Sequence, residues 1–92
     1  MKKTIIYHKV TDFKKWKEVF DSVEPMRREA GELKYEVGTV HDDPSVVYVI
    51  NEWSSLEACQ SFFSNPKLAE AMQHAGVIEK PTELILDQLA AN

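Results

Sequence analysis

Hydrophobic and polar positions follow two different periods along this chain, and the order of these periods predicts its elements. Alternation at every second residue predicts strands, and apolar residues at spacings of three and four predict helices. The alternating segments predict strands over residues 4–10, 33–40, 46–53 and 82–89. The other period predicts helices over residues 12–30, 56–63 and 66–75.

This order of elements, strand-helix-strand-strand-helix-strand, is that of the ferredoxin-like βαββαβ fold, an α+β fold. We expect a four-stranded antiparallel sheet whose two helical crossovers lie on one face. The continuous apolar run Val46-Val47-Tyr48-Val49-Ile50 is typical of a central strand that is covered on both faces. The face without helices must therefore meet water, a ligand or a second copy of the chain.

Capping residues predict where the first helix begins and ends. Asp12 precedes the apolar stripe and suits an N-cap. Pro25 cannot continue the hydrogen-bond ladder, so we expect a kink near residues 22–24. Gly31 is expected to end the helix in the left-handed conformation.

Turn and cap signals also mark the second half of the chain. Residues 41–45, His-Asp-Asp-Pro-Ser, predict a turn between the second and third strands. Ser54 and Glu57 have the spacing of a capping box. Asn65 followed by Pro66 predicts a second helix start, because proline is well tolerated at the first helical position.

Composition and charge narrow the class of protein. The 92 residues, 43% hydrophobic and 28% charged, predict one globular domain spanning 1–92. The net charge of −4 disfavours nucleic-acid and anionic-membrane partners. No apolar run is long enough for a membrane span or a signal peptide. A single cysteine, Cys59, fits a reducing compartment, so we expect a cytoplasmic protein.

The sequence contains no strong catalytic or metal-binding motif. Paired cysteines, metal-spaced histidines and a glycine-rich phosphate loop are all missing, so neither metal nor cofactor is expected. His8 is the most informative candidate, because it shares its strand face with the apolar Ile6 and Val10. It suits a general base or a ligand-binding donor; a core histidine is the alternative.

Large aromatic and polar residues are further candidates. Trp16 and Trp53 suit either core anchors or the lining of a ligand pocket. Asn51 and Glu52, near the end of the third strand, suit either the mouth of a pocket or a solvated edge. His41, in a turn, and His74, in a last helical turn, are expected on the surface.

Four stretches, together with the order of elements, resemble the antibiotic biosynthesis monooxygenase-like family of the dimeric α+β-barrel superfamily. They are VTDFKKWK (10–17), HDDP (41–44), NEWSSLEA (51–58) and NPKLAEAM (65–72). The resemblance implies that two sheets associate through their helix-free faces, so that the protein is a homodimer. It also implies a pocket between sheet and helices in each subunit.

That superfamily includes cofactor-free monooxygenases of aromatic polyketides, haem-degrading enzymes and proteins without known activity. The positions at which the haem-degrading branch has asparagine, tryptophan and histidine fall here on His8, Phe62 and Met72. All three residues depart from that pattern. Haem turnover is therefore not expected, and no cofactor is predicted.

Two functions follow as hypotheses. The first is a cofactor-independent monooxygenase that holds a small apolar or aromatic molecule, with His8 as the catalytic base for an acidic phenol. The alternative is a non-catalytic small-ligand-binding or stress-associated barrel protein. A regulatory amino-acid-binding module of the same fold stays open. The candidate pocket residues are Trp16, Phe20, Asn51, Trp53, Phe62 and Met72.

The first hypothesis requires a particular orientation of His8. We expect its ring to point into the cleft between the sheet and the first helix, toward Trp16 or Phe20. Burial among apolar neighbours is expected to lower its pKa, unless a carboxylate such as Glu52 offsets the effect.

Overall fold

The computed structural model describes residues 2–92 and has the predicted order of elements. Its strands are β1 (Lys2–Lys9), β2 (Glu32–Val40), β3 (Asp43–Trp53) and β4 (Thr82–Leu86). Its helices are α1 (Phe13–Ser22), α2 (Glu24–Ala30), α3 (Leu56–Phe63) and α4 (Pro66–His74).

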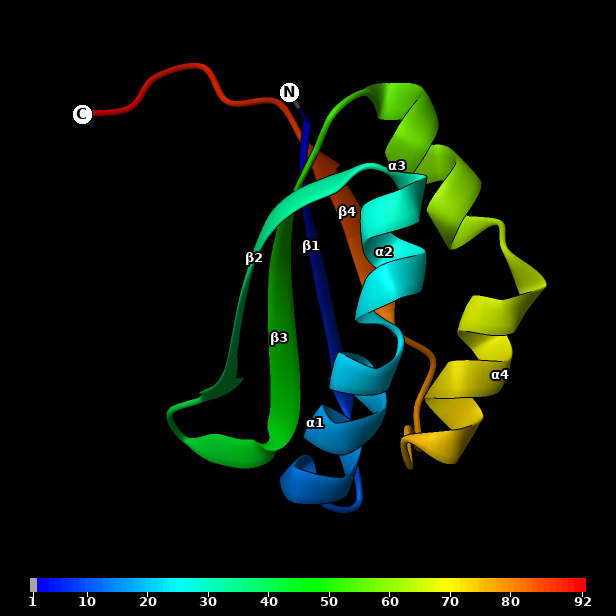
Figure 1. Cartoon of the computed structure of the whole chain (residues 1–92). Helices are drawn as coiled ribbons and strands as arrows, with labels where there is room; N and C mark the ends of the chain where they lie inside the picture. Colours follow the sequence, from blue (N-terminus) through cyan, green and yellow to red (C-terminus); the bar gives the residue numbers. More distant parts are fainter. Residues whose placement is uncertain (1) are drawn as a thin grey trace.

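The strands form one four-stranded sheet in the order β2-β3-β1-β4, and every neighbouring pair is antiparallel. In the central pair, Ile6 lies opposite Val49 and His8 lies opposite Val47. All the helices between residues 2 and 92 lie on one face of this sheet (Figure 1). The ferredoxin-like α+β fold predicted from the sequence is therefore confirmed.

The first helical segment is divided into two helices rather than kinked. Asp12 caps α1, and its Oδ1 accepts a hydrogen bond from the Lys14 amide at 2.9 Å. The break falls at Val23, within the predicted interval 22–24, because Pro25 has no amide hydrogen for the ladder. Gly31 ends α2 with a left-handed φ of 118°, as expected.

Two local predictions need correction. β3 already begins at Asp43, so the turn is confined to His41 and Asp42 rather than extending to residue 45. The N-cap of α3 is Ser55 and not Ser54: its hydroxyl accepts a hydrogen bond from the Ala58 amide at 3.1 Å. Adjacent serines offer the same capping oxygen, and the backbone geometry of the preceding strand selects the second.

The core between sheet and helices has two apolar clusters. The first, beneath α1 and the end of α4, is Val10, Trp16, Phe20, Val47, Val49 and Ala75. The second, beneath α3, is Trp53, Cys59 and Phe62. Strand alternation places Val47, Val49, Asn51 and Trp53 of β3 on this helix-covered face.

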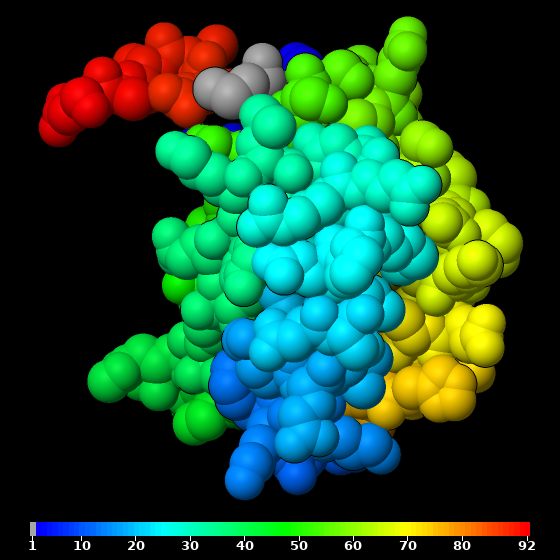
Figure 2. All heavy atoms as spheres, viewed as in Figure 1, coloured from blue at the N-terminus to red at the C-terminus, as the bar shows by residue number. Residues whose placement is uncertain are grey.

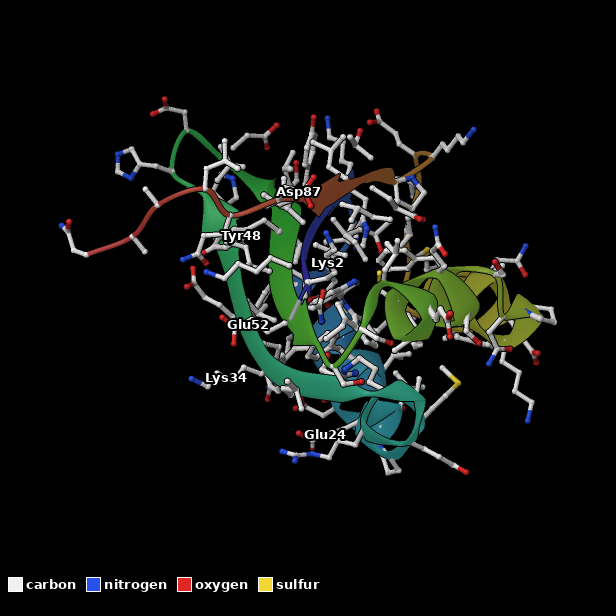
Figure 3. All side chains as sticks on the ribbon, turned by 90° about the horizontal axis from the view of Figure 1, so that it is seen from above. Lys2, Glu24, Lys34, Tyr48, Glu52 and Asp87 are labelled. Atoms are coloured by element: carbon white, nitrogen blue, oxygen red, sulfur yellow. The ribbon has the colours of Figure 1, made fainter. Side chains whose placement is uncertain are left out.

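The opposite face of the sheet is covered by no helix from the described residues 2–92. Tyr7 is 41% exposed there, and Leu84 and Leu86 of β4 are also exposed. Figure 3 shows Tyr48 and Glu52 on this side, away from the helices. The second cover that the sequence predicts for residues 46–50 is therefore not supplied by residues 2–92 of the same chain.

The chain continues past the sheet as an extended tail. β4 ends at Leu86 rather than at the predicted residue 89, and Leu89 is 94% exposed. Figures 1 and 2 show this segment, coloured red, projecting from the body of the molecule. Among residues 2–92, no helix has the length and apolar character that crossing a membrane requires.

Candidate functional site

A cavity lies between the helix-covered face of the sheet and the helices. β1 and β3 form its floor, α1 and α2 form one wall, and α3 and α4 form the other. The cavity itself has a volume of about 60 Å³, which rises to about 510 Å³ when the adjoining space that is open to solvent is counted. Most of its lining is apolar, so the cavity suits a small hydrophobic molecule better than a charged one.

The structure brings most of the candidate residues to this cavity. Its lining includes His8, Trp16, Phe20, Asn51, Phe62 and Met72. Trp53 is the exception and does not line the cavity. Its side chain is fully buried beneath α3, where its ring contacts Phe62 at a centroid distance of 5.1 Å.

His8 is buried in the floor of the cavity. Its side chain comes from β1, is 5% exposed, and lies with its ring centroid 5.8 Å from that of Trp16. Neither Nδ1 nor Nε2 has a hydrogen-bond partner among residues 2–92. Burial lowers the pKa of the imidazole below its ordinary value, because the charged form loses its hydration.

Among residues 2–92, no carboxylate compensates for this burial of His8. Glu52, the candidate named from the sequence, lies on the helix-free face, where its carboxylate is 3.7 Å from the ammonium of Lys3. Tyr7 and Tyr48 pair directly across β1 and β3 and share that face. Among the described residues, the aromatic neighbour of His8 is therefore Trp16, and these tyrosines cannot act with it.

Stacked rings from α1 form one side of the cavity. Trp16 and Phe20 are one helical turn apart, and their rings stack at a centroid distance of 5.0 Å. Phe20 in turn contacts the edge of the Tyr35 ring at 5.1 Å. The aromatic surface thus extends from His8 toward the opposite end of the cavity.

A buried ion pair occupies that opposite end, and the sequence interpretation missed it. Arg27 is 2% exposed and donates from Nε to the Glu32 carboxylate at 3.0 Å. Its guanidinium carbon lies 3.6 Å from the centroid of the Phe20 ring. Arg27 lines the cavity rather than the solvent-exposed surface of α2.

The helical period contains a signal for Arg27. Trp16, Phe20, Val23 and Arg27 are separated by four, three and four residues, so Arg27 continues the apolar stripe. An arginine at such a position needs a buried partner, and Glu32 follows it by five residues.

Hydrogen bonds extend from the ion pair across the sheet. Asn51 donates from Nδ2 to the Glu32 carboxylate at 2.6 Å and accepts from the Thr4 hydroxyl at 3.4 Å. Trp53 donates from Nε1 to the Thr4 hydroxyl at 2.9 Å. This network explains the buried position of Trp53, because an indole N–H in the core needs an acceptor.

Only a thin wall separates the cavity from the outside of the helical layer. An external groove between α1, α2 and α4 includes Lys67, Glu70 and His74 in its lining. Val19, Val23 and Ala71 line both this groove and the cavity. The two hollows are thus divided by small side chains next to the break between α1 and α2.

Within the described part of the chain, this arrangement is not accompanied by a cluster of metal-binding side chains. Among residues 2–92, no group of three or more histidine, cysteine, aspartate or glutamate side chains is arranged to hold a metal ion. The polar groups at the cavity are instead an unpaired imidazole at one end and a guanidinium with an amide at the other. They suit hydrogen bonding and proton transfer.

Comparison with known proteins identifies the family. The family model for antibiotic biosynthesis monooxygenases matches residues 9–74. The chain belongs to the antibiotic biosynthesis monooxygenase family. The match begins at Lys9, directly after His8. It covers the helices α1 and α2, the hairpin of β2 and β3, and the helices α3 and α4.

Solved structures of other proteins have the same fold as this chain. A putative antibiotic biosynthesis monooxygenase from Nitrosomonas europaea has a TM-score of 0.73 at 18% identity, covering 98% of this chain and 100% of its own. A point mutant of SnoaB, a cofactor-independent oxygenase from Streptomyces nogalater, has a TM-score of 0.77 at 11% identity, covering 98% of this chain and 94% of its own.

A monooxygenase from Streptomyces coelicolor in complex with the ligand nanaomycin D has a TM-score of 0.72 at 17% identity, covering 99% of this chain and 89% of its own. Comparison with curated protein sequences finds no significant match. At these identities the structural likeness establishes the fold, while the activity of this family member has to be argued from its own residues.

Proposed function

We propose that this protein binds a small aromatic molecule in the cavity and oxidises it as a cofactor-independent monooxygenase. The observation that supports this most strongly is His8, a buried imidazole whose two ring nitrogens have no partner among residues 2–92. Buried polar groups without partners are rare, and they are typical of sites that meet a ligand.

The proposed chemistry begins with proton transfer to His8. Its lowered pKa leaves the imidazole neutral at pH 7, so one ring nitrogen accepts the proton of an acidic phenol or anthrone. The resulting anion is electron-rich and reduces dioxygen. A CH₂ group of the substrate becomes a carbonyl, one oxygen atom is retained in the product, and the other leaves as water.

Two further observations favour this proposal. The cavity walls are apolar, and apolar surroundings accommodate both an aromatic ring and dioxygen. Two proteins of the same fold are described as a cofactor-independent oxygenase and as a monooxygenase holding nanaomycin D. These descriptions support an oxidation of a small molecule by the present chain as well.

The second candidate function is binding without catalysis. The position of the tyrosines favours it: Tyr7 and Tyr48 lie across the sheet from the cavity, so neither donates to an anion formed beside His8. The same cavity then holds an aromatic molecule without turning it over.

Replacing His8 separates the two functions. We expect the wild-type protein to raise oxygen uptake with 1,8-dihydroxyanthrone above the spontaneous rate, and His8→Ala to lower that rate at least tenfold, about 1.4 kcal/mol. His41→Ala removes an exposed histidine from a turn and is the matched control. Saturable binding without added oxygen uptake would assign the protein to the binding class.

We also propose that the protein is a homodimer formed through its helix-free faces. The exposed apolar side chains on that face include Tyr7, Leu84 and Leu86, and burying such area contributes about 25 cal/mol per Å². Sedimentation at low micromolar concentration should give twice the chain mass. A monomer under these conditions would refute the association.

A cytoplasmic location remains part of the proposal. Cys59 is unpaired and buried in the cluster with Trp53 and Phe62, as expected for a thiol that packs as a small apolar group in a reducing compartment. Fractionation of cells that express the full chain would test it.

A further inference from the structure

The cavity has two polar ends, and the proposed oxidation uses only one of them. His8 lies opposite Val47, and Asn51 lies four residues farther along β3. At about 3.3 Å per residue, the two ends are roughly 13 Å apart. The wall between them is apolar and includes Ile6, Val49 and the stacked rings of α1.

At the far end of the cavity, only some of the guanidinium nitrogens of Arg27 donate hydrogen bonds. Nε donates to Glu32 and Nη1 donates to the backbone oxygen of Phe20. Nη2 is buried and has no partner among residues 2–92, although Arg27 lines the cavity. An arginine with a purely structural role would be expected to use this nitrogen as well, because each Nη carries two donors.

The charge around Arg27 defines the acceptor that fits it. Glu32 already neutralises the guanidinium at 3.0 Å and has accepted a second hydrogen bond from Asn51 at 2.6 Å. A further anionic group would lie near the Glu32 carboxylate without an extra cation to balance it. A neutral carbonyl oxygen accepts a hydrogen bond from Nη2 without being repelled by the Glu32 carboxylate.

We propose that Arg27 is a specificity-determining residue that binds a carbonyl oxygen at one end of an elongated aromatic ligand whose hydroxyl group meets His8 at the other end. This proposal rests on the proposed function, because it assumes an aromatic molecule in the cavity. Glu32 and Asn51 are positioning residues: they hold the guanidinium so that Nη2 remains available.

The test compares two probes of the same shape. 6-Acetyl-2-naphthol carries a hydroxyl at one end and a carbonyl at the other, and 6-isopropenyl-2-naphthol replaces the carbonyl oxygen with a CH₂ group. Fluorescence titration of the wild-type protein should show at least tenfold tighter binding of the acetyl probe, which corresponds to about 1.4 kcal/mol.

The matched variant removes the guanidinium without leaving a lone buried charge. Arg27→Met combined with Glu32→Gln keeps similar volumes and keeps an acceptor for Asn51. We expect its preference for the acetyl probe to fall below threefold, while its affinity for the isopropenyl probe stays within threefold of wild type. The acetyl group also acidifies the naphthol, but that effect acts at His8 and persists in the variant.

Each outcome decides between the proposals. Equal binding of both probes by the wild-type protein would refute the role of Arg27 and leave the aromatic cavity intact. An unchanged preference in the folded double variant would refute it as well. Binding of neither probe would overturn both proposals. If the double variant does not fold, Arg27→Lys, which keeps the charge and lacks the guanidinium fork, should lose the preference in its place.

Discussion

His8 and Asn51 lie in similar positions but differ in their hydrogen bonding. Both side chains lie on the helix-covered face of the sheet, with 5% and 2% of their surface exposed. Asn51 is hydrogen-bonded to Glu32 and Thr4, whereas His8 is bonded to nothing among residues 2–92. Because an unbonded buried polar group costs stability, the hydrogen bonds of Asn51 contribute to the fold, whereas the ring nitrogens of His8 are available to a ligand.

Removing Glu32, the hydrogen-bond partner of Asn51 and Arg27, should have the largest effect on the free energy of unfolding. Glu32→Ala leaves the guanidinium of Arg27 buried without a counter-charge, so we expect the free energy of unfolding to fall by about 3–5 kcal/mol. Urea denaturation followed by circular dichroism measures the change. Glu32→Gln, which keeps the acceptor for Asn51, should lose less. A loss below about 1 kcal/mol for Glu32→Ala would mean that the network is not structural.

The effect of His8 on the free energy of unfolding should depend on pH. Because the folded-state pKa of His8 is lowered, the unfolded chain binds a proton that the folded chain does not, between that pKa and the ordinary value of 6.5. The free energy of unfolding should therefore fall as the pH is lowered through this window, with a slope of at most about 1.4 kcal/mol per pH unit.

His8→Phe isolates this contribution. The variant has no imidazole to protonate, so its stability should decline less than that of wild type below pH 6.5, while the exposed His41 and His74 are present in both proteins. Urea titrations at several pH values measure the difference. Parallel curves for the two proteins would show that His8 is not desolvated.

The smallest expected effect is that of haemin. Although His8 has free ring nitrogens, Phe62 and Met72 occupy the positions at which the haem-degrading branch has tryptophan and histidine. Titration should give no saturable Soret shift at one equivalent per chain. A tight complex that loses its haem with ascorbate and oxygen would overturn this expectation and make the cavity a haem site.

The sequence predicted the architecture because local signals agreed with the tertiary structure. Asp12 as N-cap, the break next to Pro25 and the left-handed Gly31 each specify one backbone geometry, and all three are found. Ser54 was mistaken for the cap because neighbouring serines are chemically equivalent, and only the path of the chain distinguishes them.

The sequence predicted the candidate site only where the spacing of residues along a strand or helix is informative. Strand alternation grouped His8 with the apolar Ile6 and Val10, but it does not distinguish Asn51, which lines the cavity, from Trp53, which tertiary packing puts beneath α3. Arg27 and Glu32 were missed because charged residues are assigned to the surface by default, although the helical spacing from Trp16 includes Arg27.

The thin wall at Val19, Val23 and Ala71 has a consequence for the rate of ligand exchange. Val19 and Val23 are half-buried, Ala71 contributes only a methyl group, and a change of rotamer at either valine breaks no backbone hydrogen bond. A ligand that passes these three residues would leave α1 and α4 folded. We therefore expect a small molecule to enter and leave the cavity faster than the opening motions that amide hydrogen exchange reports.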